Sequence, residues 1–368
     1  LGEYPASIKD VQSFLATKPK SDAALDAQYV MGLAQAGLKQ FDAATKTYAA
    51  ILAAADTYAA ADKVAYELGW AWIELGKTDK AVAVFHRLAK DWPNSPLAAE
   101  SLFRVGEAYY DAGNYGQAAA AYRESSQQAT TTEIGEKSMH KLGWSYLKSE
   151  DLAGAIKTFT EQLTKHPSGE LAGDARFLAG ECHFRGEDWP AAKAAYLKVI
   201  ASRDSNYLAL AIFHAGECAA SLEDWNSSRR LHQQVLDEFA EFELRPEARY
   251  GVAWALQNEG QLDTAIASYE QVTEECETET AAKARFMIGE CCFAQKKHKD
   301  ATKHFLKTVF LYNHPEWSAM AYFEAGRCFE VLRDTEQAEN CYEQVIAKYP
   351  QHAKVTDAQR RLSELKGS

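Results

Sequence analysis

Small residues recur along this chain at a nearly fixed interval. Eight glycines and one alanine stand 36 or 37 residues apart: Gly32, Gly69, Gly106, Gly143, Gly180, Gly216, Ala253, Gly289 and Gly326. We call these the landmark positions. Twelve residues after each landmark stands Ala or Ser, and sixteen residues after it stands Tyr, Phe or, once, His232. A stretch rich in Gly, Asp, Asn and Lys lies between the first two positions, so each unit is predicted to be a helix, a tight turn and a second helix.

The small and large positions predict how the two helices of a unit pack. Helix axes approach to the lower end of about 8–10 Å only where Gly or Ala stands at the crossing point, and a large side chain then fills the groove beside it. A period of this length is typical of a solenoid, in which each unit buries its apolar face on its neighbours. We therefore expect an all-α protein whose function lies on an extended surface.

The repeated residues resemble the tetratricopeptide repeats, whose pattern is a small residue, then Ala, then Phe or Tyr, often closed by Pro. Pro93, Pro167 and Pro350 each stand 24 residues after a landmark, in agreement with that pattern. The resemblance implies a right-handed α-α superhelical solenoid of nine helix-turn-helix repeats over residues 21–352. Repeats of this longer kind are similar to those of bacterial Tol-Pal-associated and outer-membrane-assembly proteins, which implies a periplasmic or cell-envelope setting. A cytoplasmic setting is the alternative.

The repeat is two or three residues longer than the family's usual 34, and the surplus follows the proline. In the segment after Pro93, Ser95 is a good helix N-cap and Pro96 suits the first helical position. These residues predict a first helix lengthened by about one turn at its N-terminus.

Both ends of the chain carry helical patterns outside the nine units. Pro19 stands 13 residues before Gly32, as Pro93 does before Gly106, so residues 1–20 are expected to hold the second helix of a truncated preceding repeat. Residues 353–368 are predicted to form a polar capping helix over the last unit. Because the chain starts at Leu1, we expect a fragment or a processed form of a longer protein.

Composition narrows the classes of partner. The net charge of −12 and the pI near 5.4 disfavour nucleic acid, which is bound through Lys and Arg. No segment approaches the roughly 20 apolar residues of a membrane-spanning helix. We expect a protein or peptide partner, with a basic or aromatic-rich segment favoured; the sequence does not indicate an oligomeric state.

The cysteines and histidines do not form a catalytic or metal pattern. Cys182, Cys218, Cys291 and Cys328 each stand two residues after a landmark, where other repeats carry Ala or Ser, and are predicted to be free thiols in the core. His232 and His140 occupy aromatic packing positions. No catalytic, phosphate-binding or zinc motif is present, so we expect no cofactor, no metal site and no enzymatic activity.

The candidate binding residues lie on the first helices. The family resemblance implies ligand contacts three residues before the landmark, one residue after it, and four to five after it. The first position forms an aromatic ladder from Tyr29 onward, and the second alternates Trp with Glu along much of the chain. The predicted partner-binding residues of a concave groove are Tyr66, Trp70, Phe103, Glu107, Tyr110, His140, Trp144, Phe177, Glu181, Phe213, Glu217, Tyr250, Trp254, Phe286, Glu290, Phe323 and Arg327.

Two interpretations of the ladder remain open at this stage. An aromatic stripe at helical spacing is usually core, so the ladder positions either pack against the adjacent helix or face a ligand. Trp70, Trp144 and Trp254 favour exposure, because Glu occupies the same position in other repeats and would not be buried unpaired. Trp and Tyr are frequent interface anchors.

Three functions are compatible with these residues. The first is a noncatalytic scaffold of the bacterial cell envelope that binds an extended segment of a partner in its groove. The second is a carbohydrate- or peptidoglycan-binding module that uses exposed Trp and Tyr faces. The third is an accessory region of a larger enzyme encoded upstream.

Overall fold

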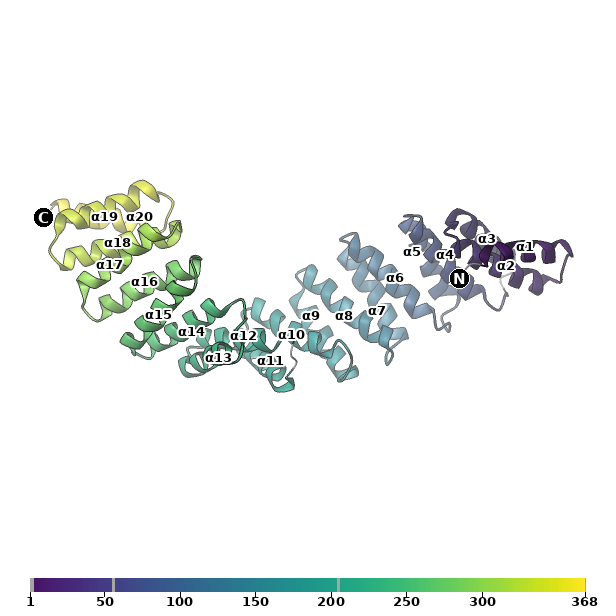
Figure 1. The fold of residues 1–368 in the computed structure, drawn as a ribbon, viewed down its shortest axis with the longest axis horizontal. Helices are drawn as coiled ribbons and strands as arrows, with labels where there is room; N and C mark the ends of the chain where they lie inside the picture. Colours follow the sequence, from purple (N-terminus) through teal and green to yellow (C-terminus); the bar gives the residue numbers. More distant parts are fainter. Residues whose placement is uncertain (1–2, 55–56, 204–205, 368) are drawn as a thin grey trace. The chain divides into compact units, whose positions relative to one another are not determined.

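The computed structural model describes residues 3–54, 57–203 and 206–367. In this part of the chain twenty α-helices occur and no strand (Figure 1). The helices divide between two compact units, residues 1–186 and 187–368. The first unit contains α1 (Tyr4–Ala16), α2 (Ser21–Gly37), α3 (Phe41–Ala54), α4 (Ala61–Glu74), α5 (Thr78–Asp91), α6 (Ala98–Asp111), α7 (Tyr115–Gln128), α8 (Glu133–Lys148), α9 (Leu152–Lys165) and α10 (Ala172–Arg185).

The second unit is built in the same way. It contains α11 (Trp189–Ser202), α12 (Leu208–Ser221), α13 (Trp225–Glu238), α14 (Arg245–Asn258), α15 (Leu262–Glu275), α16 (Glu279–Ala294), α17 (His298–Leu311), α18 (Pro315–Val331), α19 (Thr335–Lys348) and α20 (Val355–Gly367). Within each unit every helix packs mainly against the helices before and after it in the chain. This nearest-neighbour stacking confirms an all-α solenoid architecture.

The landmark residue and the second-helix aromatic are in direct contact, as the spacing predicts. A methyl group placed on Gly106 of α6 would come within 2.6 Å of the Tyr122 ring on α7. Tyr122 is completely buried, and Phe85, Phe159 and Tyr342 lie over their own landmark glycines in the same manner. The aromatic ring thus occupies the space that a Cβ would need, which is why the position takes the smallest residues.

The turn between the two helices of a repeat has one backbone conformation throughout. The residue seven positions after each landmark has a positive φ: Lys39, Gly76, Gly113, Glu150, Glu187, Glu223, Gly260, Lys296 and Arg333. In most repeats the next residue donates its N–H five residues back, as Asn114 does to the carbonyl of Tyr109 at 2.8 Å. This is the Schellman arrangement, which satisfies the last carbonyls of the first helix.

The surplus residues of the repeat do not lengthen the helix that Ser95 was expected to cap. Helix α6 begins at Ala98, and Ser95 and Pro96 lie in the connection that precedes it. Two successive turns form there, with the N–H of Ser95 bonded to Trp92 and the N–H of Ala98 bonded to Ser95. The Ser95 hydroxyl accepts from the N–H of Leu97 and donates to Asp62 on α4 at 2.6 Å.

The lengthening prediction was therefore wrong for this repeat, because the serine ties the connection to the preceding first helix instead of capping α6. The longer first helices are α2, α8, α16 and α18. In α8 a threonine caps the helix: Thr132 accepts from the N–H of Gly135.

Helices α1 and α20 occupy the two ends that the sequence sets apart from the repeats. The Tyr4 ring of α1 lies against Gly37 at the end of α2, where an added methyl group would meet it at 2.6 Å. Ala358 of α20 is fully buried, and Val355, Leu362 and Leu365 pack against the core of the second unit. Whether α1 closes a truncated repeat, and where the repeat array formally begins and ends, stay predictions.

Candidate functional site

The aromatic ladder three residues before the landmark is mostly core. Seven of its nine members are buried, namely Phe103, His140, Phe177, Phe213, Tyr250, Phe286 and Phe323, each with less than a tenth of its surface exposed. Tyr29 and Tyr66 are half-buried. Of the two interpretations left open by the sequence, packing is the one that the structure shows for these seven.

The ladder side chains pack on the second-helix aromatic of their own repeat. The ring centroids of Phe103 and Tyr122 are 5.4 Å apart, and those of Phe286 and Phe305 are 5.2 Å apart. Tilted contacts of this kind stabilise a pair beyond the area that it buries. The sequence pattern could not distinguish this contact from exposure because both place an aromatic residue at the same helical position.

The position one residue after the landmark remains accessible in all nine repeats. Leu33 and Trp254 are exposed, at 38% and 37%, and the other seven members are half-buried: Trp70, Glu107, Trp144, Glu181, Glu217, Glu290 and Arg327. The landmark residue before it is buried in every case, and the residue after it, for example each of the four cysteines, is buried in every case except Ala108. We call this set the slot. Its accessibility agrees with the argument that a position that accepts both Trp and Glu is in contact with water.

In the first unit, Trp70 lies in a small cluster of aromatic and charged groups. Its ring contacts Tyr66 edge-on with centroids 6.3 Å apart, and the Arg104 guanidinium lies 4.9 Å from the Trp70 ring. Arg104 in turn donates to Glu100 at 2.5 Å and to Glu107 at 2.6 Å. The slot residues Trp70 and Glu107 of adjacent repeats are thereby connected through one guanidinium.

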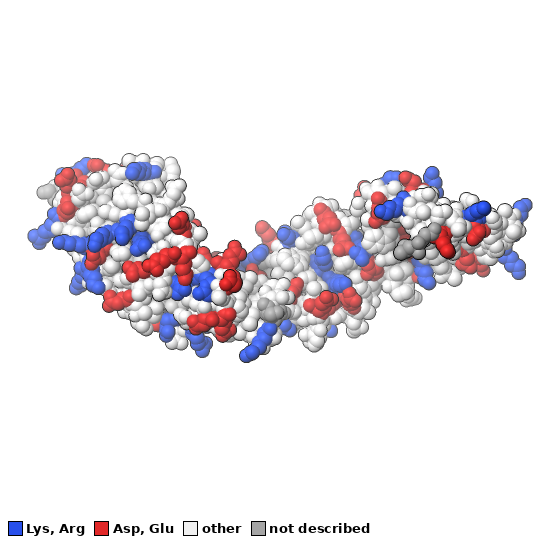
Figure 2. Space-filling view, viewed as in Figure 1, with Lys and Arg blue, Asp and Glu red and all other residues white. Residues whose placement is uncertain are grey.

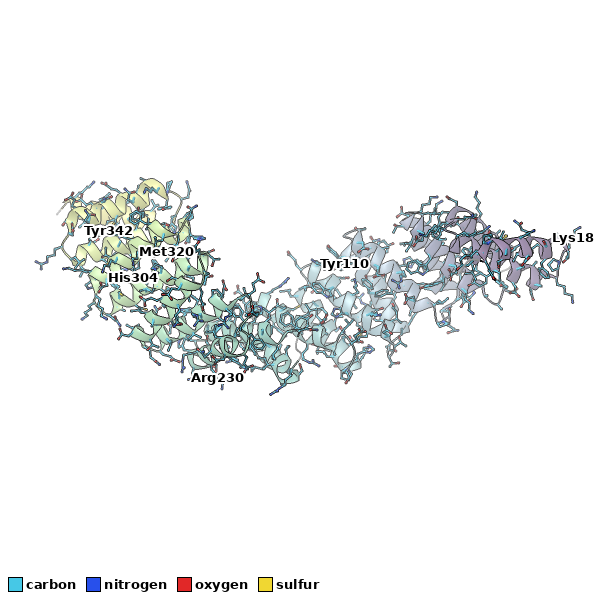
Figure 3. All side chains as sticks on the ribbon, in the orientation of Figure 1. Lys18, Tyr110, Arg230, His304, Met320 and Tyr342 are labelled. Carbon is cyan, nitrogen blue, oxygen red and sulfur yellow. The ribbon has the colours of Figure 1, made fainter. Side chains whose placement is uncertain are left out.

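Tyr110 and Trp144 lie on the next two first helices. Tyr110, labelled in Figure 3, is half-buried, with its ring 5.2 Å from that of Tyr115 and beneath the Lys141 ammonium. The Trp144 Nε1–H donates to His140 Nε2 at 3.1 Å. Burial lowers the pKa of His140, which keeps the ring neutral and able to accept this hydrogen bond.

In the second unit, aromatic residues gather around Trp254 and Lys283. The Trp254 and Trp225 rings meet edge-on at 5.3 Å. The Lys283 ammonium lies 4.4 Å from the Tyr250 ring and 5.9 Å from the Trp317 ring, and burial lowers its pKa. Lys283 and Trp317 were missed by the sequence reasoning, because they stand six and nine residues before their landmarks, outside the positions considered.

Charged residues two positions before the landmark lie beside the slot residues. The sequence reasoning did not include them among the candidates. Three repeats pair this position with the slot residue of the same helix: Arg104 with Glu107, His214 with Glu217, and Glu324 with Arg327, at 2.6, 2.7 and 2.6 Å. Residues at i and i+3 are neighbours on a helix surface. Opposite charges at this spacing are readable in the sequence and provide the signal that could have found them.

Two carboxylates of the second unit approach one another. Burial and the nearby Glu324 raise the pKa of Glu290 to about 7, and burial raises that of Glu324 against the opposing effect of Arg327. Arg327 donates to Glu324, whereas no hydrogen bond from a described residue reaches Glu290. A cation placed beside Glu290 would favour its charged form and would be bound in return.

The cysteine prediction is confirmed for the core. Cys182, Cys218, Cys291 and Cys328 have no exposed surface. Burial raises the pKa of Cys182 to about 11 and those of Cys291 and Cys328 to about 12, so these thiols stay protonated at neutral pH. Among the described residues no group of three or more His, Cys, Asp or Glu is placed to hold a metal ion. Within the same residues, none of the helices has the length and apolarity to cross a membrane.

The histidine prediction is also confirmed. His232 is buried in the second-helix aromatic position, 5.5 Å from Phe213 between ring centroids, and its Nδ1 lies 3.2 Å from the Ser228 hydroxyl. Ser228 itself replaces the alanine of other repeats. Together the two substitutions place a hydrogen-bonded polar pair where other repeats have an apolar one.

Stacked helix pairs, with a partly exposed row of Trp and Glu on the first helices, define an α-solenoid. A family model described as tetratricopeptide repeat matches residues 66–130, 140–207 and 250–314, and a second with the same description matches residues 320–352. The chain belongs to the tetratricopeptide repeat family. Repeats of this family support a role as a scaffold for protein–protein interaction and are typically noncatalytic.

Solved structures with similar folds carry the same family description. The C-terminal part of a repeat-containing protein from Cytophaga hutchinsonii is 14% identical, with a TM-score of 0.44 over 80% of this chain and 98% of that one. A tetratricopeptide repeat protein from Parabacteroides merdae is 13% identical, with a TM-score of 0.41 over 83% of this chain and 98% of that one. No curated protein gives a significant match.

Proposed function

We propose that this protein is a noncatalytic scaffold that binds an extended segment of a partner protein along the first helices of each unit. The observation that carries the proposal is the slot, which stays accessible after all nine landmarks although the residue before it is buried each time and the residue after it is buried everywhere except at Ala108. Trp70, Trp144 and Trp254 supply large anchors there, and Trp is enriched among the residues that dominate interface energies.

The partner segment is expected to carry basic and aromatic or apolar side chains. The slot carries four carboxylates between and beside its tryptophans: Glu107, Glu181, Glu217 and Glu290. A Lys or Arg of the partner beside Glu290 would offset the burial and the repulsion from Glu324 that raise the pKa of this carboxyl group. The buried ladder residues are not proposed as ligand contacts, because they pack inside the repeats beneath the slot residues. The half-buried Tyr66 and Tyr110 remain candidate contacts.

A bacterial cell-envelope location is part of this proposal. It rests on the resemblance of the 36–37-residue repeats to those of envelope proteins. A signal peptide or a lipidated cysteine upstream of Leu1 in the full-length protein would support the envelope location. A full-length N-terminus without any export signal would contradict it.

The test begins with a ligand selected from a displayed library of extended dodecapeptides. The variant Trp70→Ala/Trp144→Ala/Trp254→Ala is then compared with Trp72→Ala/Trp92→Ala, which removes tryptophans outside the slot. We expect the triple slot variant to lose at least about 100-fold in affinity by calorimetry and the control variant to bind normally. Unchanged affinity in a correctly folded slot variant would refute the proposal.

A carbohydrate-binding module is the second candidate, favoured by the same partly exposed indole rings. Titration with peptidoglycan fragments while Trp fluorescence is recorded separates the two. A saturable change that disappears in the triple slot variant would favour the glycan, and its absence would favour the protein segment.

A further inference from the structure

A pocket of about 360 Å³ lies in the first unit, between the second helices α7 and α9. Helix α8 forms its floor, where Met139 and Leu142 are buried. Its rim carries three cations, Arg123, Lys157 and Lys165, and one carboxylate, Glu161. None of the residues that line the pocket belongs to the slot, so the two sites are separate.

The cations of this rim are only partly neutralised. Lys165 pairs with Glu161 at 2.7 Å. Lys157 is exposed and forms no ion pair with any described residue. Arg123 donates to the Tyr146 hydroxyl, which fixes its guanidinium at the rim, and its other N–H groups make no hydrogen bond with the described chain. Arg123 and Lys157 therefore offer charged donors to a ligand.

Cations occupy both the Arg123 position and the Lys157 position in only one pair of adjacent repeats, and we call each such pair a junction. Arg123 stands 17 residues after its landmark and Lys157 stands 14 residues after the next one. At the other junctions at least one of these two positions is neutral or acidic; Lys303, for example, follows Glu270. The repeat architecture alone does not require two cations here, because Ala and Thr occupy the same positions elsewhere.

The cationic rim of this pocket contrasts with the negative net charge of the whole chain. At −12 the whole molecule repels acidic ligands, and acidic and basic side chains are intermixed on the face seen in Figure 2. An anion is bound only where local cations outweigh this repulsion. An apolar floor beneath a cationic rim fits the methylene stem and carboxylate of a glutamate.

We propose that the α7–α9 pocket binds carboxylate side chains of an acidic segment of a partner protein. The occupant differs in charge from the basic segment proposed for the slot, so one chain would hold two partners on two sets of helices. This inference does not depend on the proposed function of the slot, because none of the residues that line the pocket belongs to the slot.

The test uses the full chain and fluorescein-labelled hexaglutamate, with binding followed by fluorescence anisotropy at 50 mM salt. We expect saturable binding that weakens with added salt and falls at least about tenfold in Arg123→Gln/Lys157→Gln. The matched control is Lys46→Gln, because Lys46 has the repeat position of Lys157 without an arginine opposite it. Circular dichroism melting verifies that all variants fold.

Several results would overturn the proposal. The first is that labelled hexaglutamate does not bind the native chain. The second is that Lys46→Gln loses as much hexaglutamate affinity as Arg123→Gln/Lys157→Gln. Displacement of the peptide by equimolar inorganic phosphate would assign the pocket to a small free anion instead. Tighter binding of labelled hexathymidylate through Arg123 and Lys157 would assign it to nucleic acid. Retention of hexaglutamate binding by the triple slot variant separates this test from that of the slot.

Discussion

At the residue scale, backbone conformation rather than side-chain identity defines the turn of each repeat. Of the nine turn positions seven residues after a landmark, all with positive φ, three are glycine and the others are Lys, Glu or Arg. The left-handed conformation costs an L-residue about 1–2 kcal/mol relative to glycine. The sequence indicates a turn here through Gly, Asp and Asn, but the non-glycine members hide the regular conformation.

Two nearby glycines should respond to alanine with opposite signs. Gly113 has φ of +76° and Gly116 lies in α7, and neither has a heavy atom within 4 Å of an added methyl group. Gly113→Ala is expected to destabilise the protein by about 1 kcal/mol through backbone strain. Gly116→Ala is expected to stabilise it by about 0.5 kcal/mol through helix propensity. Urea unfolding of both variants checks the prediction, and equal effects would contradict it.

His232 should make the protein sensitive to acid. Burial lowers the pKa of His232 to about 4, whereas in an unfolded chain it is near 6.5. Between these pH values the unfolded chain binds the additional proton, so stability falls as pH falls through that window. The variant Ser228→Ala/His232→Phe restores the residues of other repeats. Between pH 7.5 and pH 5 its free energy of unfolding should fall by about 2 kcal/mol less than that of the native chain.

Urea titrations at the two pH values measure this difference. His304, whose pKa burial also lowers to about 4, is common to both proteins and cancels in the comparison. An identical pH dependence in the two proteins would show that His232 is not buried as described.

At the element scale, the contact between the landmark and the second-helix aromatic determines how closely the two helices approach. The sequence predicted this contact from spacing alone, because a Gly at the crossing point leaves space only for a side chain from the facing helix. It did not predict where the surplus residues go. Ser95 has the residue type of an N-cap, and its bond to Asp62 becomes visible only when the preceding repeat is in place.

A double-mutant cycle at Gly106 and Tyr122 tests the contact. Gly106→Ala should destabilise the protein by about 1–3 kcal/mol, because the methyl group meets the buried ring at 2.6 Å. In the Tyr122→Leu background the same change should cost at least about 1 kcal/mol less, since no ring is left to displace. Strict additivity of the two substitutions would indicate that the two side chains are not in contact.

The candidate site was predictable only in part at this scale. The slot follows from the alternation of Trp with Glu, which signals contact with water. The burial of the ladder could not be predicted from the sequence, because a Phe at this helical position can pack against a neighbouring helix or against a ligand. Only the position of the neighbouring helix decides between the two. The contacts of Arg104 with Trp70 and of Lys283 with Tyr250 required the stacking of adjacent first helices, since each joins two repeats.

At the scale of the whole molecule, the repeats share one division between a buried and an accessible side, and the cysteines follow it. Cys276 is half-buried, whereas the remaining six cysteines are buried. We expect one thiol per chain to react rapidly with an aromatic disulfide reagent under native conditions. Cys276→Ser should remove that fast phase, whereas several fast thiols in the native chain would contradict the packing described.

The most direct measurement concerns which helices a bound segment touches. A photo-crosslinking benzoylphenylalanine is placed at position 254, in the slot of the second unit, or at position 197, on the second helix α11; both native residues, Trp254 and Leu197, are exposed hydrophobic side chains. With the library-selected peptide bound, we expect cross-links from position 254 and none from position 197. Cross-links from position 197 alone, or equally from both, would contradict binding along the first helices.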